Sequence, residues 1–319
     1  MATPSAVLVG GTIAIDHVKT PAAEAENLLG GSASYAALAA SYFTSPVHLV
    51  GIVGQDFPPQ HLTMLESHGV TLDGVERSQG DSFAWSGEYH ENMNDRTTHS
   101  VSVNVLEDWE VKVPAALAAS PIVVLANMSP DNQLQLLDQC TAPERFVVAD
   151  TMDLWINIAR GRLHEVLKRI DLLVINEGEA RDFMGTSNLI LAGRRLLETG
   201  PRNVVIKLGE FGAMLFSEQE TGSADWALSE NTFFRCAAFP LREVADPTGA
   251  GDTFLGGLAG HLASTGKTRF GFEDIRRAVV QGSVVASFTC EAFSTRRLET
   301  LDTAEIARRL DLFKRMSDW

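Results

Sequence analysis

Short apolar runs rich in Val, Ile and Leu recur along most of this sequence, and helix-like segments separate several of them. This alternation predicts βαβ units on a mostly parallel sheet that is buried on both faces, which places the chain in the α/β class. The apolar runs span Ala6–Ile15, Val47–Val53, Pro121–Ala126, Phe146–Asp150, Asp171–Ile175 and Asn203–Leu208. The helix-like segments include Ser32–Tyr42, Gln60–His68 and Asn132–Cys140. No repeat or change of composition marks a linker, so one unit is expected over residues 1–319.

Polar side chains follow three of the apolar runs at the point where each strand is expected to end. Asp16 follows the first run, Asp150 closes the fourth, and Asn176 follows the fifth. Ligands of open α/β sheets bind beyond the carboxyl ends of the strands. The three residues are therefore candidates for a common site.

Residues 82–105 depart from this rhythm. Phe83, Trp85, Gly87 and Tyr89 alternate with other residues, a turn-like segment follows at 91–95, and alternation then returns. Such a pattern predicts a β-hairpin inserted into the α/β chain. An ordinary antiparallel extension is the simplest explanation, and a cover over a substrate is the functional one.

The charge of the chain excludes some classes of partner. The formal net charge is −15, and nucleic-acid binding needs clustered Lys and Arg. No uninterrupted apolar run approaches the roughly 20 residues of a membrane span, and no basic segment precedes an apolar one at the N-terminus. Three widely spaced cysteines argue against a disulfide framework or a structural zinc site. We expect a cytoplasmic protein without a nucleic-acid or membrane partner.

The segment Asp246–Phe254 carries the strongest chemical signal. Two glycines and an alanine form a tight turn, and an apolar run with helical spacing starts at once. The unpaired amides at such a helix N-terminus attract an anion, most often phosphate. A carboxylate at Asp252 would repel that anion, unless it takes the proton from a hydroxyl that attacks phosphorus. The segment thus indicates a small-molecule kinase, with an ordinary turn and an acidic first helical turn as the alternative.

The sequence resembles the PfkB family of ribokinase-like sugar and nucleoside kinases over about residues 6–298. The motifs that match, in the family's order, are Gly30-Gly31-Ser32-Ala33, Gly51–Asp56, Asn176–Glu179, Lys207–Gly212 and Asp246–Phe254. The resemblance implies a three-layer α/β/α sandwich with a mostly parallel central sheet. It also implies a small β-sheet lid, formed by roughly 14–20 and 82–105, that covers the substrate.

The resemblance implies roles for named residues. Asp252 would be the general base, and the amides of Gly249, Ala250, Gly251 and Asp252 the anion hole. Acceptor-binding positions would be Asp16, Gly30, Gly31 and Ser32, together with Asp252. ATP would contact Asn176, Lys207, Gly209, Gly212, Thr248, Gly249, Gly251 and Gly282. The helix over Arg276–Thr289 would pass beside the adenine.

The resemblance also implies bound cations. Asn176 and Glu179 would hold Mg²⁺ through its waters, since Mg²⁺ keeps much of its hydration in proteins. Asp246 and Thr248 match loop residues of the family's K⁺ site. The later segment 289–294 lacks the family's usual glycine, so K⁺ activation is an open expectation. An ordinary acidic first helical turn is the alternative role for Glu179.

One departure from the family bears on the acceptor. Sugar kinases of the family continue the glycine pair with Lys-Gly and place Asn three positions after that Lys, whereas Ser32 and Tyr35 stand at those two positions here. Tyr35 and the aromatic residues of the hairpin would suit a flat base, which favours a nucleoside over a free sugar.

Two alternatives stay open beside the nucleoside kinase. They are a sugar kinase of the ribose or fructose type and a non-catalytic sugar- or nucleotide-binding regulator on the same fold. The sequence contains neither a G-x-x-x-x-G-K-[ST] motif nor G-x-G-x-x-G after the first strand, which disfavours P-loop and dinucleotide folds. Either a monomer or a homodimer formed through the lid is expected.

Overall fold

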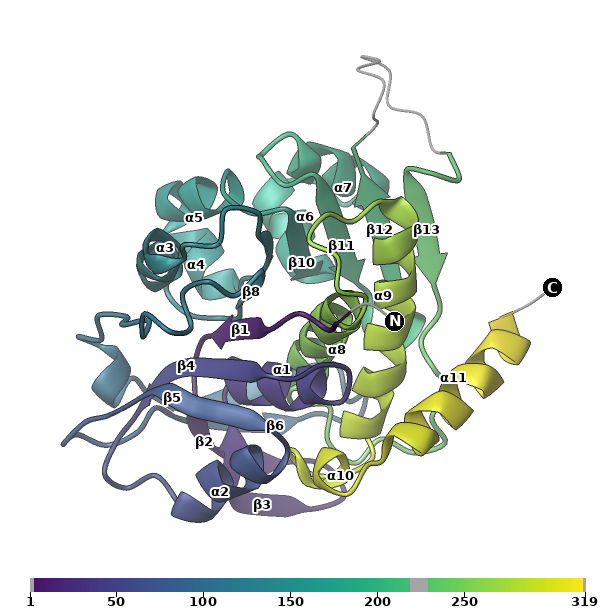
Figure 1. The fold of residues 1–319 in the computed structure, drawn as a ribbon. Coiled ribbons are helices and arrows are strands. Elements are labelled where there is room, and N and C mark those ends of the chain that lie inside the picture. The colour runs from purple at the N-terminus through teal and green to yellow at the C-terminus, as the bar shows by residue number, and fades with distance from the viewer. Residues whose placement is uncertain (1–2, 219–228, 318–319) are drawn as a thin grey trace.

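The computed structural model describes residues 3–218 and 229–317 (Figure 1). Within these residues the strands form a nine-stranded sheet and a four-stranded sheet. In spatial order, the large sheet contains β13 (Phe233–Cys236), β12 (Ala213–Ser217), β11 (Asn203–Lys207), β10 (Leu172–Asn176), β9 (Phe146–Asp150), β8 (Ile122–Leu125), β1 (Val7–Gly10), β4 (Val47–Val53) and β5 (Val70–Arg77). The small sheet contains β3 (Glu24–Gly30), β2 (Ala14–Lys19), β6 (Ala84–Tyr89) and β7 (Arg96–Ser102).

The large sheet is parallel from β11 to β5 and antiparallel at its β12–β13 edge. Helices cover both of its faces, because alternate strand residues point to opposite sides. In β1, Val7 and Val9 join one hydrophobic cluster and Leu8 joins the other. The fold is therefore the expected ribokinase-like three-layer α/β/α sandwich.

Two groups of helices form the outer layers. The face of Val7 and Val9 carries α1 (Ser32–Ser41), α2 (Pro59–Ser67), α8 (Ala250–Ser264), α9 (Phe272–Thr289), α10 (Arg296–Glu299) and α11 (Thr303–Ser317). The face of Leu8 carries α3 (Pro130–Gln139), α4 (Asp153–Ile158), α5 (Arg160–Leu167), α6 (Glu177–Met184) and α7 (Leu189–Leu197). Short 3₁₀ turns occupy Asn104–Leu106 and Gly209–Phe211.

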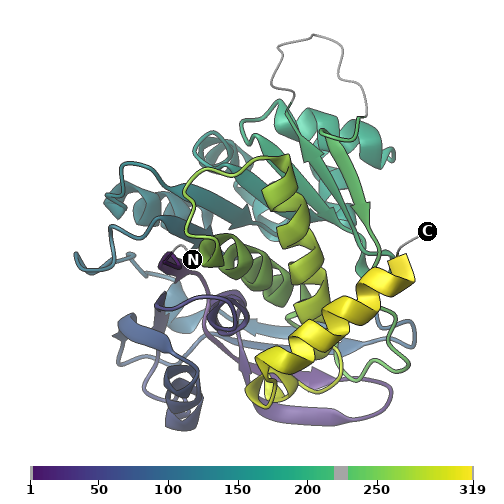
Figure 2. The same ribbon diagram turned by 45° about the vertical axis from the view of Figure 1, so that its right-hand side comes forward.

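The helix pair α8 and α9 carries the predicted phosphate loop at one end (Figure 2). Small residues let α8 approach α1 closely, since a Cβ on Gly256 would lie 2.1 Å from the carbonyl oxygen of Ala36. Leu255, Leu258 and Leu262 of α8 are fully buried against the sheet. Burial of this kind contributes about 1.5–3 kcal/mol per large aliphatic side chain, which fixes the start of α8 relative to the strand ends.

The strand predicted over Ala6–Ile15 is wrong in one respect. The chain leaves the large sheet after β1, where Gly11 N–H donates to the carbonyl of Val50 at 3.2 Å. It then enters the small sheet, where Ile15 N–H donates to the carbonyl of Phe83 at 2.9 Å. Asp16 is consequently a residue of β2 and not a residue at the carboxyl end of the first core strand.

The small sheet contains the predicted hairpin as β6 and β7, the predicted lid segment at 14–20 as β2, and one further strand, β3. β6 and β7 pair antiparallel across the turn at 90–95, and β7 ends at Ser102, before the expected limit. The sequence pattern did not indicate β3, because its Ala and Glu residues favour helix by intrinsic propensity. β3 pairs antiparallel with β2, and β2 pairs parallel with β6, which unites distant segments in one layer.

Among the described residues, no helix combines the length and the apolar character that crossing a bilayer requires.

Candidate active site

The helix α8 begins at a turn that leaves backbone donors free. Its N-cap, Gly249, has the left-handed conformation φ 75°, ψ 0°. Ala250 N–H donates to the carbonyl of Pro247 at 3.2 Å, so this amide, expected in the anion hole, is already used within the turn. The amides of Gly251 and Asp252 lie in the first helical turn, where no preceding helical carbonyl is available to them. Both donors lie at the positive end of the helix, and the Asp252 N–H also interacts with the carboxyl group of its own side chain.

Both glycines of this turn sit against side chains. A Cβ on Gly249 would lie 2.4 Å from the ring of Tyr35, which is 1% exposed and fixed in the core. A Cβ on Gly251 would lie 3.0 Å from Nζ of Lys207. The turn is thus wedged between a buried aromatic ring on one side and a cationic side chain on the other.

Asp252 has an environment that suits proton transfer near neutral pH. Burial raises the pKa of its carboxyl to about 7, and the nearby negative charge of Asp150 adds to this rise. The positive charges of Lys207 and Arg96 act in the opposite direction on the same pKa. A carboxyl with a pKa close to the working pH is well matched to general base catalysis.

Lys207 and Asp150 form an ion pair beside the turn. Lys207 Nζ lies 2.8 Å from Oδ2 of Asp150, and Thr151 N–H donates to Oδ1 of the same carboxylate at 2.8 Å. Burial alone would lower the pKa of Lys207, but Asp150 and Glu179 raise it above its usual value, so the amine stays charged. Asp150 is the last residue of β9, and Lys207 is the last residue of β11. The local sequence around either residue does not indicate that the two form a pair.

Asn176 and Glu179 cap the start of α6. Asn176 Oδ1 accepts from Glu179 N–H at 2.8 Å, and Glu179 Oε2 accepts from Asn176 N–H at 2.9 Å, which forms a capping box. Burial raises the pKa of Glu179 to about 8, and the charge of Asp150 adds to this rise. The capping contacts orient a second carboxylate beside Asp150 and explain the helix start on their own.

A cavity of about 650 Å³ joins these groups. Its lining includes the turn at 249–252, Asp150, Asn176, Glu179 and Lys207 from the large sheet side, and Tyr89, Asn92, Met93, Asn94 and Arg96 from the small sheet. Asn94 Nδ2 donates to Glu210 Oε2 at 3.4 Å, which links the small sheet to the β11–β12 connection. Sequence reasoning missed Arg96, because no pattern distinguishes it from other polar residues of an exposed hairpin.

Four of the predicted acceptor-binding residues lie together but do not line this cavity, whereas the fifth, Asp252, does. Gly30 leaves room for Asp16, since a Cβ there would lie 2.1 Å from the carboxyl carbon. Gly31 has φ 89° and would place a Cβ 2.4 Å from the carbonyl of Thr12. Ser32 Oγ donates to the carbonyl of Asn127 at 2.9 Å. These contacts hold the β3–α1 junction beneath the small sheet.

The glycines predicted on the nucleotide side fall into two groups. Gly209 and Gly212 line the cavity with φ 56° and 92°, respectively. Gly282 instead packs on α8, because a Cβ there would lie 2.7 Å from the carbonyl oxygen of Phe254. Its neighbour Ser283, the other small residue expected beside the base, lines the cavity.

The predicted K⁺-site residues hold the turn together. Asp246 is fully buried, and its carboxylate accepts from Thr248 N–H at 2.8 Å and from Ser294 N–H at 3.0 Å. Burial raises the pKa of Asp246. The carboxylate therefore ties the phosphate turn to the segment after α9, and a role in K⁺ binding stays a prediction.

The aromatic residues of the hairpin have different surroundings. Tyr89 lines the cavity, whereas Trp85 does not. A Cβ on Gly87 would lie 2.3 Å from the Trp85 ring, and Trp85 Nε1 donates to Thr98 Oγ1 at 3.3 Å. Among the aromatic residues of the hairpin, Tyr89 is therefore the one placed to stack against a ligand in this cavity.

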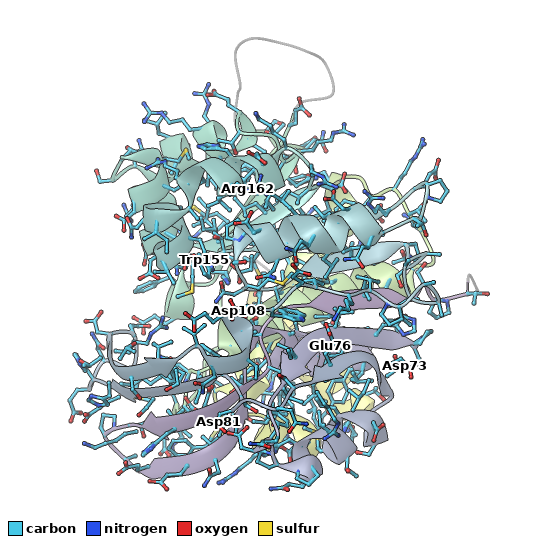
Figure 3. The ribbon with its side chains drawn as sticks, turned by 90° about the vertical axis from the view of Figure 1, so that its left-hand side faces the viewer. Asp73, Glu76, Asp81, Asp108, Trp155 and Arg162 are labelled. Carbon is cyan, nitrogen blue, oxygen red and sulfur yellow. The ribbon has the colours of Figure 1, made fainter. Side chains whose placement is uncertain are left out.

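A second hollow of about 580 Å³ lies on another face of the molecule, lined in part by Glu76, Asp81 and Asp108 (Figure 3). Glu76 accepts from Trp109 Nε1 at 2.8 Å and from Lys112 Nζ at 2.9 Å. Its carboxylate is thus already paired within the fold.

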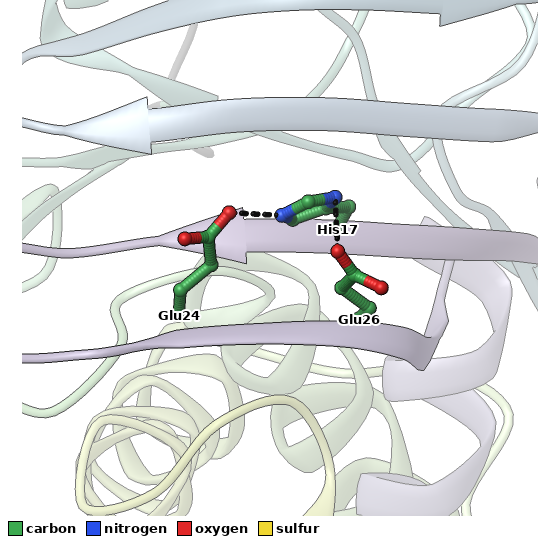
Figure 4. Close-up of side chains that lie close together, drawn as sticks. All are labelled: His17, Glu24 and Glu26. Atoms are coloured by element: carbon green, nitrogen blue, oxygen red, sulfur yellow. Dashed lines mark hydrogen bonds and ion pairs between the residues drawn. The ribbon is translucent and has the colours of Figure 1, made fainter.

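His17, Glu24 and Glu26 cluster on β2 and β3 of the small sheet (Figure 4). Glu24 Oε1 lies 2.6 Å from His17 Nε2, and Glu26 Oε1 lies 3.7 Å from His17 Nδ1. The side chains are 35%, 52% and 66% exposed in chain order, and a solvated cross-strand charge group accounts for them.

Asp16 gives a pH-dependent stability that can be measured. Burial raises the pKa of Asp16 to about 8, and Asp246 and Asp252 add to this rise. Between pH 4 and 8 the folded state therefore keeps a proton that the unfolded state has lost, so the unfolding free energy falls as pH rises, by about 1.4 kcal/mol per pH unit. Asp16→Asn removes this dependence, and we expect its stability relative to wild type to increase steadily over that range in urea unfolding.

The exposed residue Asp73 supplies the control for this test. Asp73→Asn should change the unfolding free energy little and without this trend. A stability difference for Asp16→Asn that stays constant from pH 4 to 8 would contradict the assignment.

The model of the pfkB family carbohydrate kinases matches residues 7–301. A cytidine kinase of Thermococcus kodakarensis is 28% identical over 261 residues, which cover 80% of this chain and 88% of that protein. A nucleoside kinase of Methanothermobacter thermautotrophicus is 25% identical over 289 residues, which cover 89% of this chain and 84% of that protein.

Solved structures share the fold over nearly the whole chain. A ribokinase from Thermotoga maritima has a TM-score of 0.73 and 20% identity, covering 96% of this chain and 99% of that chain. A nucleoside kinase from Methanocaldococcus jannaschii has a TM-score of 0.73 and 15% identity, covering 98% of this chain and 100% of that chain.

Proposed function

Because the chain belongs to the pfkB family of carbohydrate kinases, we propose that it transfers the terminal phosphoryl group of ATP to a hydroxymethyl group of a nucleoside. The observation that carries this proposal is Asp252 at the start of α8. Its carboxyl has a pKa raised to about 7 and lines the cavity next to the free amides of the turn. A binding protein would gain nothing from a carboxyl inside its anion-binding turn.

The chemistry of the turn follows from its geometry. The amides of Gly251 and Asp252 would stabilise the negative charge that develops on the phosphoryl oxygens, as an oxyanion hole does. The carboxylate of Asp252 would take the proton of the acceptor hydroxyl as that oxygen attacks phosphorus. Proton removal and charge stabilisation would thus meet within one helical turn.

The carboxylates beside the turn fit a hydrated Mg²⁺ ion. Asp150 and Glu179 are oxygen donors that line one cavity, and Asn176 adds an amide oxygen; ligands of this kind are the ones Mg²⁺ prefers. When bound, the ion would offset charge on the ATP phosphates. The capping contact of Glu179 would keep its own carboxylate in a fixed orientation beside the ion. Lys207 would add a fixed positive charge near Gly251.

Removal of Lys207 should affect stability and nucleotide binding separately. Lys207→Met leaves Asp150 buried without its partner, which costs about 3–5 kcal/mol of unfolding free energy. The double variant Lys207→Met/Asp150→Asn removes both charges, so we expect much of the stability to return in urea unfolding.

Nucleotide binding should stay weak in that double variant. Loss of a charge-assisted hydrogen bond of about 1.5–3 kcal/mol would raise KM for ATP about tenfold to a hundredfold. Wild-type KM for ATP in the double variant would show that Lys207 serves the fold alone.

The names of the two sequence relatives, a cytidine kinase and a nucleoside kinase, support a nucleoside acceptor. Ser32, which stands where the family's sugar kinases have Lys, points the same way, and Tyr89 offers an aromatic face in the cavity. Tyr35, which was also expected to suit a base, is instead buried in the core and does not line the cavity. A free sugar remains the second candidate, supported by the family and by the ribokinase neighbours.

A parallel assay of ATP consumption with nucleosides and with free pentoses and hexoses tests this choice. We expect kcat/KM to be higher for at least one nucleoside than for every sugar. Turnover with sugars alone would show that the acceptor is a sugar and not a nucleoside, and the proposed kinase activity would still stand. No turnover with either class, in the presence of measurable ligand binding, would favour the non-catalytic regulator.

A further inference from the structure

One wall of the cavity is mostly apolar and contains no residue of the small sheet. The flat faces of a nucleobase bind well to apolar surfaces of this kind. Since Tyr89 of the small sheet is assigned to the acceptor, we expect the adenine of ATP at the apolar wall, as the family resemblance implies for α9. This α9 wall consists of Phe239, Leu241 and Val244 from the segment after β13, and of Ala286 and Ser287 from α9.

Arg309 joins the two segments of the α9 wall from outside the cavity. It lies on α11, the yellow helix that packs against α9 (Figure 2). Its Nη1 donates to Ser287 Oγ at 3.0 Å, and its Cζ lies 4.8 Å from the ring centroid of Phe239. The residue itself does not line the cavity. Arg309 thus contacts one wall residue from α9 and one from the segment after β13.

The guanidinium of Arg309 is held in place on several sides. Its Cζ lies 3.5 Å from the ring centroid of Phe288, which is buried. The Glu291 carboxylate accepts from Arg309 Nη2 and, at 3.2 Å, from Arg297 Nε. Only 15% of the Arg309 side chain is exposed, so the guanidinium has little freedom to move. A planar cation fixed in this way keeps the two wall residues that it contacts in defined positions.

The hydrogen bonds of Ser287 leave its hydroxyl free only to accept. The hydroxyl donates to the carbonyl of Val284 at 2.6 Å, and its oxygen accepts from Arg309. A hydroxyl has one hydrogen and two lone pairs, so one lone pair stays available on the cavity wall. Ser287 can therefore accept a hydrogen bond from an amino group of a bound base, but it cannot donate one to a carbonyl oxygen. This polarity favours adenine over guanine, because adenine has an amino group where guanine has a carbonyl oxygen.

We propose that Arg309 is a positioning residue for the phosphate donor, which fixes the α9 wall so that Ser287 selects adenine over guanine. This role rests on the proposed kinase function. The helix α11 then contributes to nucleotide affinity from outside the cavity, and it takes no part in the transfer step at Asp252. Loss of Arg309 should consequently weaken nucleotide binding and leave kcat and acceptor binding in place.

Calorimetric binding of ADP and GDP, together with steady-state kinetics, tests this role. For wild type we expect an affinity for ADP that is about tenfold or more above that for GDP. Arg309→Met should lower the affinity for ADP, and raise KM for ATP, by about tenfold to a hundredfold, because it loses a hydrogen bond from a charged group. The kcat and the KM for the nucleoside should stay close to wild type. Ser287→Ala should bring the affinities for ADP and GDP close to each other.

Two variants control for charge and for stability. Arg308→Met removes the neighbouring charge at an exposed position of α11 and should keep wild-type affinities. Arg309→Lys keeps a charge for Glu291, so its melting temperature should stay closer to wild type than that of Arg309→Met. Its affinity for ADP should nevertheless remain low, because an amine cannot reproduce the planar contacts with Ser287 and Phe239.

Four outcomes would overturn the role of Arg309. Wild-type affinity for ADP in Arg309→Met would show that the α9 wall does not depend on this residue. Full recovery of affinity in Arg309→Lys would attribute the loss to the stability of α11. Equal affinities for ADP and GDP in wild type would exclude selection by Ser287. A rise in KM for the nucleoside in place of KM for ATP would put the acceptor at the α9 wall.

The binding measurements also separate this role from the kinase function. Weaker ADP binding in Arg309→Met, with a wild type that binds ADP but transfers no phosphoryl group, would overturn the kinase function and leave the role of Arg309 standing. Absence of nucleotide binding by wild type would overturn both.

Discussion

Replacing Asp252 by Asn is expected to lower kcat by about 10²–10⁴, because the amide keeps the size of the side chain but cannot accept the proton of the acceptor hydroxyl. Affinity for ATP should stay the same or rise, since one negative charge leaves a cavity that must hold a polyphosphate. Steady-state kinetics and calorimetric binding of ATP would measure both effects on one preparation.

The pH profile of wild type provides an independent check of the same residue. Burial raises the pKa of Asp252 to about 7, so the free enzyme gains the ionised base as pH rises through that value. We expect kcat/KM to increase with pH up to about 7 and then to level off. A near-wild-type kcat in Asp252→Asn would remove Asp252 from the role of base.

Replacing Gly249 by Ala is expected to lower kcat by about 10²–10³, the cost of displacing an oxyanion-hole donor. Gly249 has φ 75°, and the new Cβ would lie 2.4 Å from the buried ring of Tyr35. Since Tyr35 is fixed in the core, the turn would have to move and carry the amides of Gly251 and Asp252 with it. Kinetics and thermal melting would be compared in parallel.

Gly69→Ala is the control for backbone strain. Gly69 has φ 82°, and no atom lies within 4 Å of a Cβ placed there. Both variants should lose about 1 kcal/mol of stability from the left-handed conformation. Loss of activity should be confined to Gly249→Ala, and an equally active Gly249→Ala would show that the position of this turn does not matter for transfer.

The strands and helices that form the layers of the fold could be predicted, because each is indicated by a short, continuous sequence pattern. Val47–Val53 and Phe146–Asp150 are continuous apolar runs, and both are strands with those bounds in the structure. The motif Asn176–Glu179 is likewise local: an acidic first helical turn is one interpretation of it, and in the structure it begins α6 as a capping box. By contrast, Ala and Glu in Glu24–Gly30 favour helix, and only pairing with β2 makes this segment a strand.

The parts of the site that sequence reasoning missed depend on contacts between distant segments. The ion pair of Asp150 and Lys207 joins residues 57 positions apart, and neither position reveals its partner. Arg96 reaches the cavity only because the small sheet lies over it. Gly282, which the resemblance places at the nucleotide, does not line the cavity, and its small size lets α9 pack closely on α8. The contacts of such residues are determined by tertiary packing, which short sequence patterns do not show.

Identification of the phosphorylated atom tests the central claim most directly. The protein would be incubated with ATP and the best nucleoside from the acceptor panel, and the product examined by proton-coupled ³¹P NMR. Phosphate on a hydroxymethyl oxygen gives a triplet, because two methylene protons couple to phosphorus with similar constants, and we predict this signal for wild type and its near absence for Asp252→Asn. A doublet from a secondary hydroxyl, or inorganic phosphate as the sole product, would contradict the account.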